Sequence, residues 1–103
     1  MAYGHVCVKV VWNDAKNLAN QKKHGVSFEE AAELLASDDA RLDIFDEEHS
    51  GMEERFISIG PIQRGLVLVV WTERDSSEVR VISARWATRQ ERALYQSHIG
   101  TPP

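Results

Sequence analysis

The sequence has one cysteine, three prolines and no long apolar run among its 103 residues. The single Cys7 excludes an internal disulfide framework and a thiolate metal cluster. The longest apolar stretch, Gly65 to Trp71, falls far short of the ~20 residues that a membrane-spanning helix requires. No apolar segment with a small-residue cleavage site occurs near the N-terminus, so no secretory signal is visible. We therefore expect a cytoplasmic protein that does not enter a membrane.

Positive charge is also scarce, and it is unevenly distributed. Twelve Lys and Arg stand against sixteen Asp and Glu, and the net charge of −4 is low for a protein that binds nucleic acid. Residues 1–28 carry +3, residues 29–54 carry −10 and residues 55–103 carry +3. Because folding can bring the two basic segments together, a local positive surface is compatible with the negative total. The acidic segment could limit non-specific RNA binding or face a basic partner segment.

Local signals predict a small α+β domain. Asn13 is a good helix N-cap, Gly25 marks a helix end, and capping boxes begin at Ser27 and Thr88. β-branched and aromatic runs predict the strands. The expected elements, in the order β-α-α-β-β-β-β-α, are strands over 6–12, 41–45, 55–62, 66–72 and 78–84 and helices over 14–24, 28–36 and 88–98.

Short turns connect the last three predicted strands, which specifies an antiparallel meander. The strand over 66–72 is apolar on both faces, so we expect it to be central and covered on both sides. The predicted architecture is an antiparallel sheet packed by helices. We expect a single domain over residues 1–98 and a flexible tail over 99–103.

The first predicted helix carries a polar stripe. Lys16, Asn20 and Lys23 share one face by helical spacing, and His24 lies beside them. Two cations, an amide and an imidazole would suit a phosphate backbone, with His24 able to move protons near neutral pH. The alternative is a solvated helix face whose terminal His complements the helix dipole.

The last predicted strand carries a second basic group. Arginine binds phosphate in a bidentate manner, so Arg80 and Arg85 are candidate RNA contacts. Strict alternation puts these two side chains on opposite faces of a strand, and they converge only if Arg85 lies beyond the strand or a bulge occurs near Ser83. The alternative is that these arginines pair with nearby glutamates. Trp86 could stack on a base, and it is equally a candidate core residue.

A carboxylate next to an arginine occurs where the acidic segment meets the third strand. Glu54 beside Arg55 is a candidate general base next to a phosphate contact, or a routine surface ion pair. No spacing of His, Cys and carboxylates matches a metal site, and no glycine-rich phosphate loop occurs, so we expect no metal and no cofactor. Composition and spacing leave catalysis and binding equally open.

Three blocks of the sequence, in order over residues 10–95, resemble BrnT-type toxins. The run from Lys23 to Ala31 joined to Ile-Ser-Ala-Arg is a specific signal. The blocks are Trp12-Asn-Asp-Ala-Lys16 with Asn20 and Lys23-His-Gly-Val-Ser-Phe-Glu-Glu-Ala31, then His49-Ser-Gly-Met-Glu-Glu-Arg-Phe56, then Arg80-Val-Ile-Ser-Ala-Arg-Trp-Ala-Thr88 with Glu91, Arg92 and Tyr95.

The resemblance implies a RelE-like fold and an RNA-cleaving toxin of a type II toxin–antitoxin pair. It implies a ribbon-helix-helix antitoxin that neutralises the toxin, with operator DNA bound only through the complex. Metal-free cleavage needs a base, an acid and cations around the phosphate. His24 and Glu54 are the candidates for proton transfer, in either role. The expected phosphate contacts are Lys23, Arg55, Arg80 and Arg85, and the further substrate contacts are Lys16 and Trp86.

A different class of function is also consistent with the sequence. The chain could be a non-catalytic interaction module that binds its antitoxin and helps it to repress DNA. RNA degradation by the purified protein in a chelator separates the two, because only the ribonuclease degrades RNA.

Overall fold

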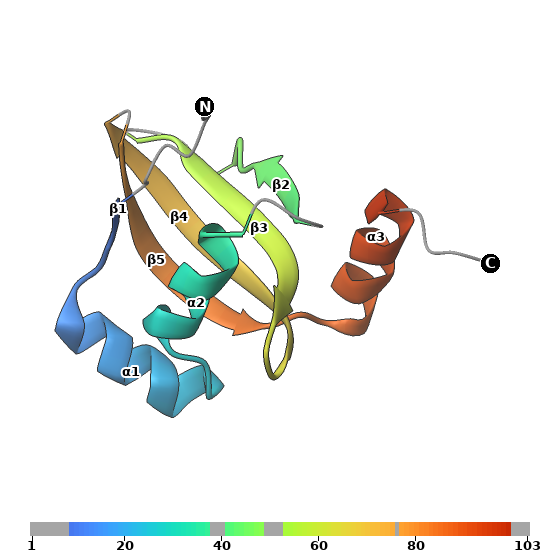
Figure 1. Cartoon of the computed structure of the whole chain (residues 1–103), viewed down its shortest axis with the longest axis horizontal. Helices are drawn as coiled ribbons and strands as arrows, with labels where there is room; N and C mark the ends of the chain where they lie inside the picture. Colours follow the sequence, from blue (N-terminus) through green and yellow to red (C-terminus); the bar gives the residue numbers. More distant parts are fainter. Residues whose placement is uncertain (1–8, 38–40, 49–52, 76, 100–103) are drawn as a thin grey trace.

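The computed structural model describes residues 9–37, 41–48, 53–75 and 77–99 (Figure 1). Three helices and five strands occur in them. None of these helices is long and apolar enough to cross a membrane. The elements are β1 (Lys9–Val11), α1 (Asp14–His24), α2 (Phe28–Leu35), β2 (Leu42–Phe45), β3 (Arg55–Ile62), β4 (Gly65–Asp75), β5 (Glu78–Trp86) and α3 (Arg89–Ile99).

The five strands form one mixed sheet in the order β1-β5-β4-β3-β2. The antiparallel meander of β3, β4 and β5 is confirmed, and so is the central place of β4. The expectation of a wholly antiparallel sheet is wrong, because β1 pairs with β5 in the parallel direction. Residues 6–8 of the predicted first strand lie outside the described residues. The direction of β1 depends on a long-range pairing that no local pattern encodes.

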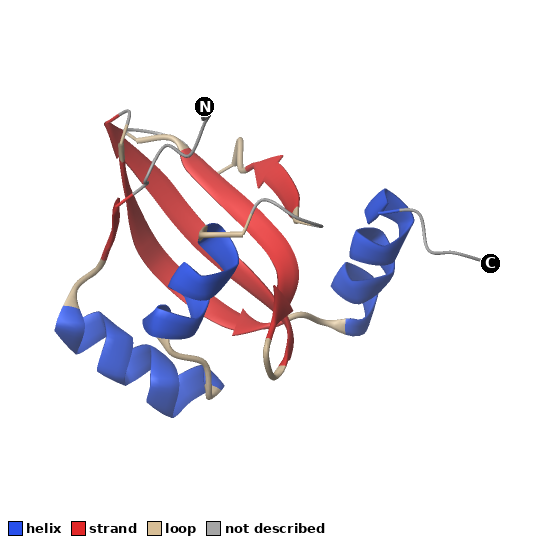
Figure 2. Cartoon of the chain, viewed as in Figure 1, coloured by secondary structure: helices blue, strands red, loops and turns tan. Residues whose placement is uncertain are grey.

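Helices lie on both faces of this sheet (Figure 2). On one face, which we call the α2 face, Phe28 and Leu34 of α2 form a core with Val67 and Val69 of β4. On the other, the α3 face, Tyr95 packs against the sheet in a smaller cluster. Because side chains alternate along a strand, β4 supplies both clusters, as its continuous apolar sequence predicted. The helix α3 contacts mainly β2 and β3, so the β4 and β5 part of its face is less covered.

The helix α1 is attached to the sheet mainly through amide side chains. Its expected cap is confirmed, since the Asn13 side chain accepts a hydrogen bond from the backbone N–H of Lys16. Asn17 and Asn20 are the buried residues of this helix, while Leu18 is 62% exposed. Asn20 lies on the same face of α1 as Lys16 and Lys23, as predicted, but its side chain is buried and not solvated.

Asn20 completes the edge of β5 where β1 has ended. Its amide nitrogen donates to the carbonyl oxygens of Val26 and Ala84, at 2.9 and 2.7 Å, and its oxygen accepts from the Ala84 N–H at 3.3 Å. Asn17 similarly accepts from the N–H of Phe28 at 2.8 Å. Buried backbone groups need hydrogen-bond partners, and these two amides supply them at the junction of α1, α2 and β5.

Candidate nucleic-acid interface

A bulge in β5 brings Arg80 and Arg85 to the same face of the sheet. Val70 of β4 lies opposite Ser83, and the next residue, Trp71, lies opposite Val81, so Ile82 is an extra residue on β5. The extra residue reverses the alternation after it. Arg80 then lies opposite Thr72, and Arg85 opposite Leu68, on the α3 face. A bulge near Ser83 was one of the two ways in which the sequence allowed Arg80 and Arg85 to converge, and the structure contains it.

Arg55 joins this face from the neighbouring strand. Thr72 of β4 pairs with Arg55 of β3 on one side and with Arg80 of β5 on the other. Strands are spaced by about 4.8 Å, so the backbones of the two arginines are about 10 Å apart. Thr72 itself is buried, and its hydroxyl donates to the Glu54 carbonyl oxygen at 2.6 Å. The two side chains therefore flank one short stretch of the sheet.

Three adjoining hollows follow the open part of the α3 face and the neighbouring α1. The edge hollow, of about 370 Å³, and the central hollow, of about 270 Å³, share Lys16. The central hollow and the α3 hollow, of about 300 Å³, share Ile82 and Ser83. The polar side chains that line them are Asn13, Lys16, Arg74, Glu78 and Arg80 at the edge, Lys16, Asn20, Lys23, His24 and Ser83 at the centre, and Asp46, Arg55, Ser83, Arg85 and Glu91 near α3.

Of the two residues predicted to transfer protons, His24 lines the central hollow. His24 is half-buried there, at the C-terminal end of α1, with the exposed Lys16 and Lys23 from the same helix. The basic last turn of α1 also suits the negative end of the helix dipole. The sequence-predicted grouping of His24 with these two lysines is thus present in the structure.

Arg85 is held in the α3 hollow by Glu91. Its two terminal nitrogens donate to the two carboxylate oxygens of Glu91 at 2.8 Å each. This side-chain hydrogen bonding from Arg85, with a backbone bond from Thr88, lowers the pKa of Glu91 to about 2. Glu91 also closes the predicted capping box with Thr88 at the start of α3. The predicted alternative of an arginine–glutamate pair therefore applies to Arg85.

The hollows together carry a positive surface on a negative protein. Their lining holds six cationic side chains against three carboxylates, with His24 counted as neutral. We call this surface the cationic face. Its cations are Lys16, Lys23, Arg55, Arg74, Arg80 and Arg85, and its carboxylates are Asp46, Glu78 and Glu91.

Two predicted site residues lie away from the cationic face. Trp86 points to the α2 face, where the Arg64 guanidinium carbon lies 5.0 Å from the centroid of its ring. Arg64 in turn forms an ion pair with Glu30 at 2.7 Å. Trp86 thus packs at the junction of two loops and does not join Arg85, because neighbouring residues of a strand face opposite sides. Glu54 is exposed before β3 and does not line any of the three hollows.

Arg74 and Ser83 line the cationic face and were missed by the sequence reasoning. The predicted strand ends at residue 72, before Arg74, whereas β4 extends to Asp75. Ser83 was considered only as a place for a bulge. A signal existed for Arg74, since it is one more basic residue next to the predicted basic strand. No group of three or more His, Cys, Asp and Glu side chains in the described part of the chain could hold a metal ion.

The fold and this surface define a small α+β domain with a cationic face suited to a polyanion. A family model described as "Ribonuclease toxin, BrnT, of type II toxin-antitoxin system" matches residues 12–91. No curated protein matches the chain. The 1.1 Å crystal structure of the Brucella abortus ribonuclease toxin BrnT is similar, with a TM-score of 0.62 and 22% sequence identity, over 80% of this chain and 99% of that chain. That likeness shows a shared fold.

The chain belongs to the BrnT family of ribonuclease toxins of type II toxin–antitoxin systems. Membership of this family brings with it an antitoxin partner. The family model covers α1, the meander and the start of α3, so every cation of the cationic face lies within the matched residues.

Proposed function

We propose that this protein is a RelE-like endoribonuclease that cleaves RNA on its cationic face by metal-independent acid–base chemistry. The observation that supports this most is the central hollow, where His24 lies beside Lys16 and Lys23 and next to the hollows that contain Arg80 and Arg85. An imidazole beside cationic side chains supplies two of the kinds of group that phosphodiester cleavage requires. Its expected setting is the cytoplasm.

The proposed reaction is attack by the RNA on itself. The 2′-hydroxyl loses its proton to a base, its oxygen bonds to the adjacent phosphorus, and the bond from phosphorus to the 5′-oxygen breaks. The leaving 5′-oxygen takes a proton from an acid. His24 performs one of the two proton transfers, and Glu54 remains the sequence-based prediction for the other. Trp86 has no part in the proposal, because it lies on the opposite face.

The cations act on the charge that develops at phosphorus. Fixed positive groups that already point at the phosphate stabilise the transition state more than the ground state, where less negative charge faces them. Arg80 forms no salt bridge with any carboxylate that the structure describes, so its guanidinium is available to a phosphate oxygen. Arg85 keeps its Glu91 partner, which fixes its orientation. The proposed phosphate contacts are Lys23, Arg55, Arg80 and Arg85, with Lys16 as a further substrate contact.

We also propose that the antitoxin is a ribbon-helix-helix protein, and that operator DNA is bound only by the toxin–antitoxin complex. The resemblance of the sequence to BrnT-type toxins supports this. Co-purification of the chain with the product of the neighbouring gene, followed by operator binding with and without that product, tests both statements. Operator binding by the toxin alone would contradict the second.

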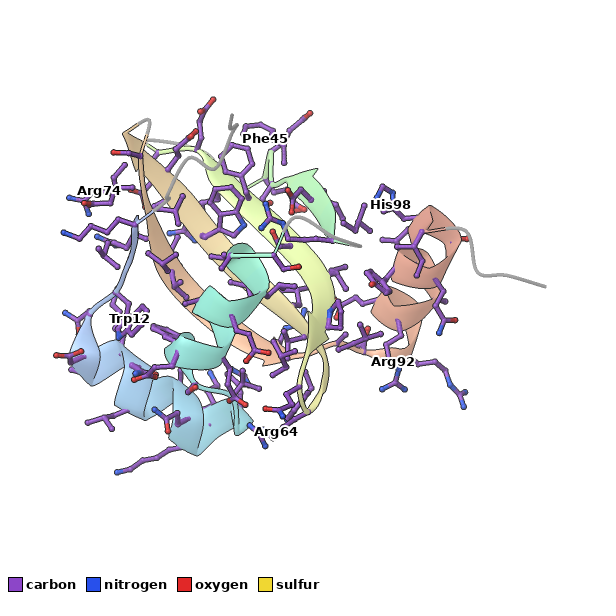
Figure 3. The ribbon with its side chains drawn as sticks, viewed as in Figure 1. Trp12, Phe45, Arg64, Arg74, Arg92 and His98 are labelled. Atoms are coloured by element: carbon purple, nitrogen blue, oxygen red, sulfur yellow. The ribbon has the colours of Figure 1, made fainter. Side chains whose placement is uncertain are left out.

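Cleavage of RNA by purified protein in EDTA tests the proposed activity, and His24→Ala and Arg80→Ala test the site. Removing a general acid or base lowers the rate by about 10²-fold or more, and we expect a loss of about 10-fold to 10²-fold for Arg80→Ala. His98→Ala and Arg92→Ala are matched controls, because Figure 3 shows both residues on α3, far from α1. Both controls are expected to cleave as the wild type does.

Each contrary result has a distinct meaning. If His24→Ala and Arg80→Ala cleave RNA and arrest growth as the wild type does, the site assignment is wrong. If cleavage stops in EDTA and returns with magnesium, the metal-independent chemistry is wrong. If the wild type arrests growth without cleaving RNA, the protein acts as an interaction module.

A further inference from the structure

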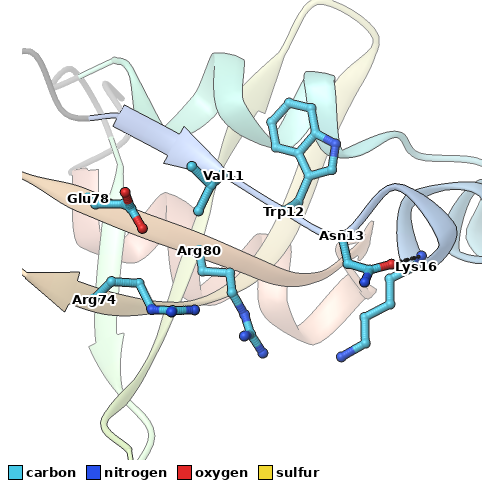
Figure 4. Close-up of a pocket in the computed structure, with 7 residues that line it drawn as sticks. All are labelled: Val11, Trp12, Asn13, Lys16, Arg74, Glu78 and Arg80. Carbon is cyan, nitrogen blue, oxygen red and sulfur yellow. Dashed lines mark hydrogen bonds between the residues drawn. The ribbon is translucent and has the colours of Figure 1, made fainter.

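We propose that the edge hollow is a second phosphate subsite, which binds an RNA phosphate next to the scissile one, with Arg74 as its dedicated contact. This rests on the proposed cleavage of RNA and adds a substrate-binding residue to it. The hollow is formed by β1, the start of α1, the C-terminal end of β4 and the start of β5 (Figure 4). It shares Lys16 with the central hollow, so a ligand strand that leaves His24 enters it directly.

A second irregularity of the sheet places Arg74. Glu73 lies opposite Val79 and Asp75 lies opposite Glu78, so Arg74 is an extra residue on β4. Bulges of this kind redirect a side chain next to a functional site. In Figure 4 the charged ends of Arg74, Arg80 and Lys16 extend to the same side of the strands, with Arg80 in the middle. Three separate elements therefore contribute cations to one hollow.

Among the described residues, none of the three cations of the edge hollow has a salt-bridge partner. Arg41, Arg64 and Arg85 each have a carboxylate partner at 3.0 Å or less. Within the part of the chain that the structure describes, no ion pair or hydrogen bond involves the guanidinium groups of Arg74 and Arg80. The same holds for the ammonium group of Lys16, whose backbone N–H alone is bonded, to Asn13.

One carboxylate also lines the edge hollow, but the hollow keeps a net positive charge. Glu78 is half-buried there and leaves three cations facing one anion. In a protein with more acids than bases, such a local surplus of positive charge indicates an anionic ligand. Arginine suits phosphate in particular, because its planar guanidinium donates two parallel hydrogen bonds to the oxygens.

The described lining of the edge hollow provides charged groups but no aromatic side chain that is free to stack on a base. Trp12, its one aromatic residue, packs edge-to-face against Phe28 with ring centroids 6.4 Å apart, so its ring belongs to the core and is not free to stack on a base. Sequence-specific recognition of single-stranded RNA needs stacked and hydrogen-bonded bases. The subsite therefore binds the RNA backbone without regard to base sequence, and the contact it adds is sensitive to salt.

Binding of a non-cleavable RNA tests this subsite independently of cleavage. The probe is a fluorescent octanucleotide with 2′-O-methyl groups, titrated with wild-type protein, Arg74→Ala, Arg74→Lys and the control Arg92→Ala. We expect Arg74→Ala to bind about three- to tenfold more weakly at low salt, and the slope of log K against log salt to become shallower by about 0.7, the value for one lost contact to single-stranded RNA. Arg74→Lys should recover most of the affinity, and Arg92→Ala should bind as the wild type does.

The outcomes separate this subsite from the proposed cleavage. If Arg74→Ala binds the octanucleotide with wild-type affinity and slope, the subsite is refuted, whether or not the wild type cleaves RNA. If the wild type cleaves no RNA but binding depends on Arg74 as stated, the subsite stands and the proposed chemistry fails. A DNA duplex that binds as tightly as the octanucleotide, with the same loss in Arg74→Ala, would overturn the assignment to an RNA strand. A loss in Arg74→Ala that is as large for a dinucleotide as for the octanucleotide would place Arg74 at the scissile phosphate.

Discussion

Replacement of Asn20 by alanine should release α1 from the sheet at a cost that follows from its hydrogen bonds. The amide makes three bonds to buried backbone groups, two to Ala84 and one to Val26. Each such bond contributes about 1 kcal/mol net to stability. Alanine is a better helix former than asparagine by about 0.6 kcal/mol, which offsets a part of the loss. We therefore expect Asn20→Ala to lower the free energy of unfolding by about 2.5 kcal/mol.

Urea unfolding followed by circular dichroism measures this change. For a domain of this size, each kcal/mol corresponds to about 4–8 °C in Tm, so the melting temperature should fall by about 10–20 °C. Lys22→Ala is the control on the same helix, because Lys22 is exposed, and its effect should stay within about 0.5 kcal/mol. Asn20→Asp removes the donor and buries a carboxylate among carbonyls, so at neutral pH it should be more destabilising than Asn20→Ala.

The aspartate variant adds a pH-dependent signature. Burial next to carbonyl oxygens raises the pKa of a carboxyl in the folded state. The folded Asn20→Asp protein would then bind its proton more tightly than the unfolded chain, so its stability should rise as the pH falls through the folded-state pKa toward the unfolded-state pKa. If Asn20→Ala unfolds within 0.5 kcal/mol of the wild type, the idea that this amide holds α1 on β5 is wrong.

Two further predictions concern charge and backbone conformation. The pKa of Glu30 and of Glu91 is lowered from the ordinary value of 4.5 to about 2, mainly by side-chain hydrogen bonds from Arg64 and Arg85, respectively. The stabilisation of the fold by these two ionised glutamates is therefore present above about pH 4.5 and is lost as the pH falls toward 2. Urea unfolding between pH 5 and pH 2 should show a shallower loss for Glu91→Gln than for the wild type, and equal slopes would contradict this. Gly25 ends α1 in the left-handed region with φ of 73°, and a Cβ there meets no atom closer than 3.7 Å, so Gly25→Ala should cost about 1 kcal/mol through backbone conformation alone. An unchanged Tm would refute that account.

The helix boundaries could be predicted from the sequence because their causes are local. The Asn13 cap and the capping boxes at Ser27 and Thr88 depend on residues three positions apart, and the structure contains all three. The glycine end of α1 is equally local, and it is confirmed at Gly25. Strand β3 has the predicted bounds, since its turn residues flank it directly.

Two features that could not be predicted depend on long-range contacts. On α1 the asparagines Asn17 and Asn20 are buried, because backbone groups of α2 and β5 need their amides, and this burial has no local signal in the sequence. The parallel pairing of β1 is likewise invisible in a local pattern. For the site, the sequence indicated that Arg80 and Arg85 meet only if Arg85 lies beyond the strand or a bulge occurs near Ser83, and the structure has the bulge, at Ile82.

Trp86 and Glu54 show the limit of reasoning from neighbouring positions. Each stands next to an arginine of the cationic face, and proximity in sequence suggested a shared role. In a strand, adjacent side chains face opposite sides, so Trp86 joins the α2 face while Arg85 joins the α3 face. For Glu54, the structure provides a role for its carbonyl oxygen, which accepts from Thr72.

The attachment of α1 to β5 has a consequence for the synthesis of the protein. The bonds between Asn20 and Ala84 join residues 64 positions apart, and β1 reaches the sheet only by pairing with β5. Contacts between such distant segments form late, because the intervening chain must first be ordered. While β5 has not yet emerged from the ribosome, the part of the nascent chain that can fold contains His24 and Lys16 but not Arg80 and Arg85. The cationic face therefore forms only after β5 has been synthesised, so its arginines and its histidine come together in the folded chain and not before.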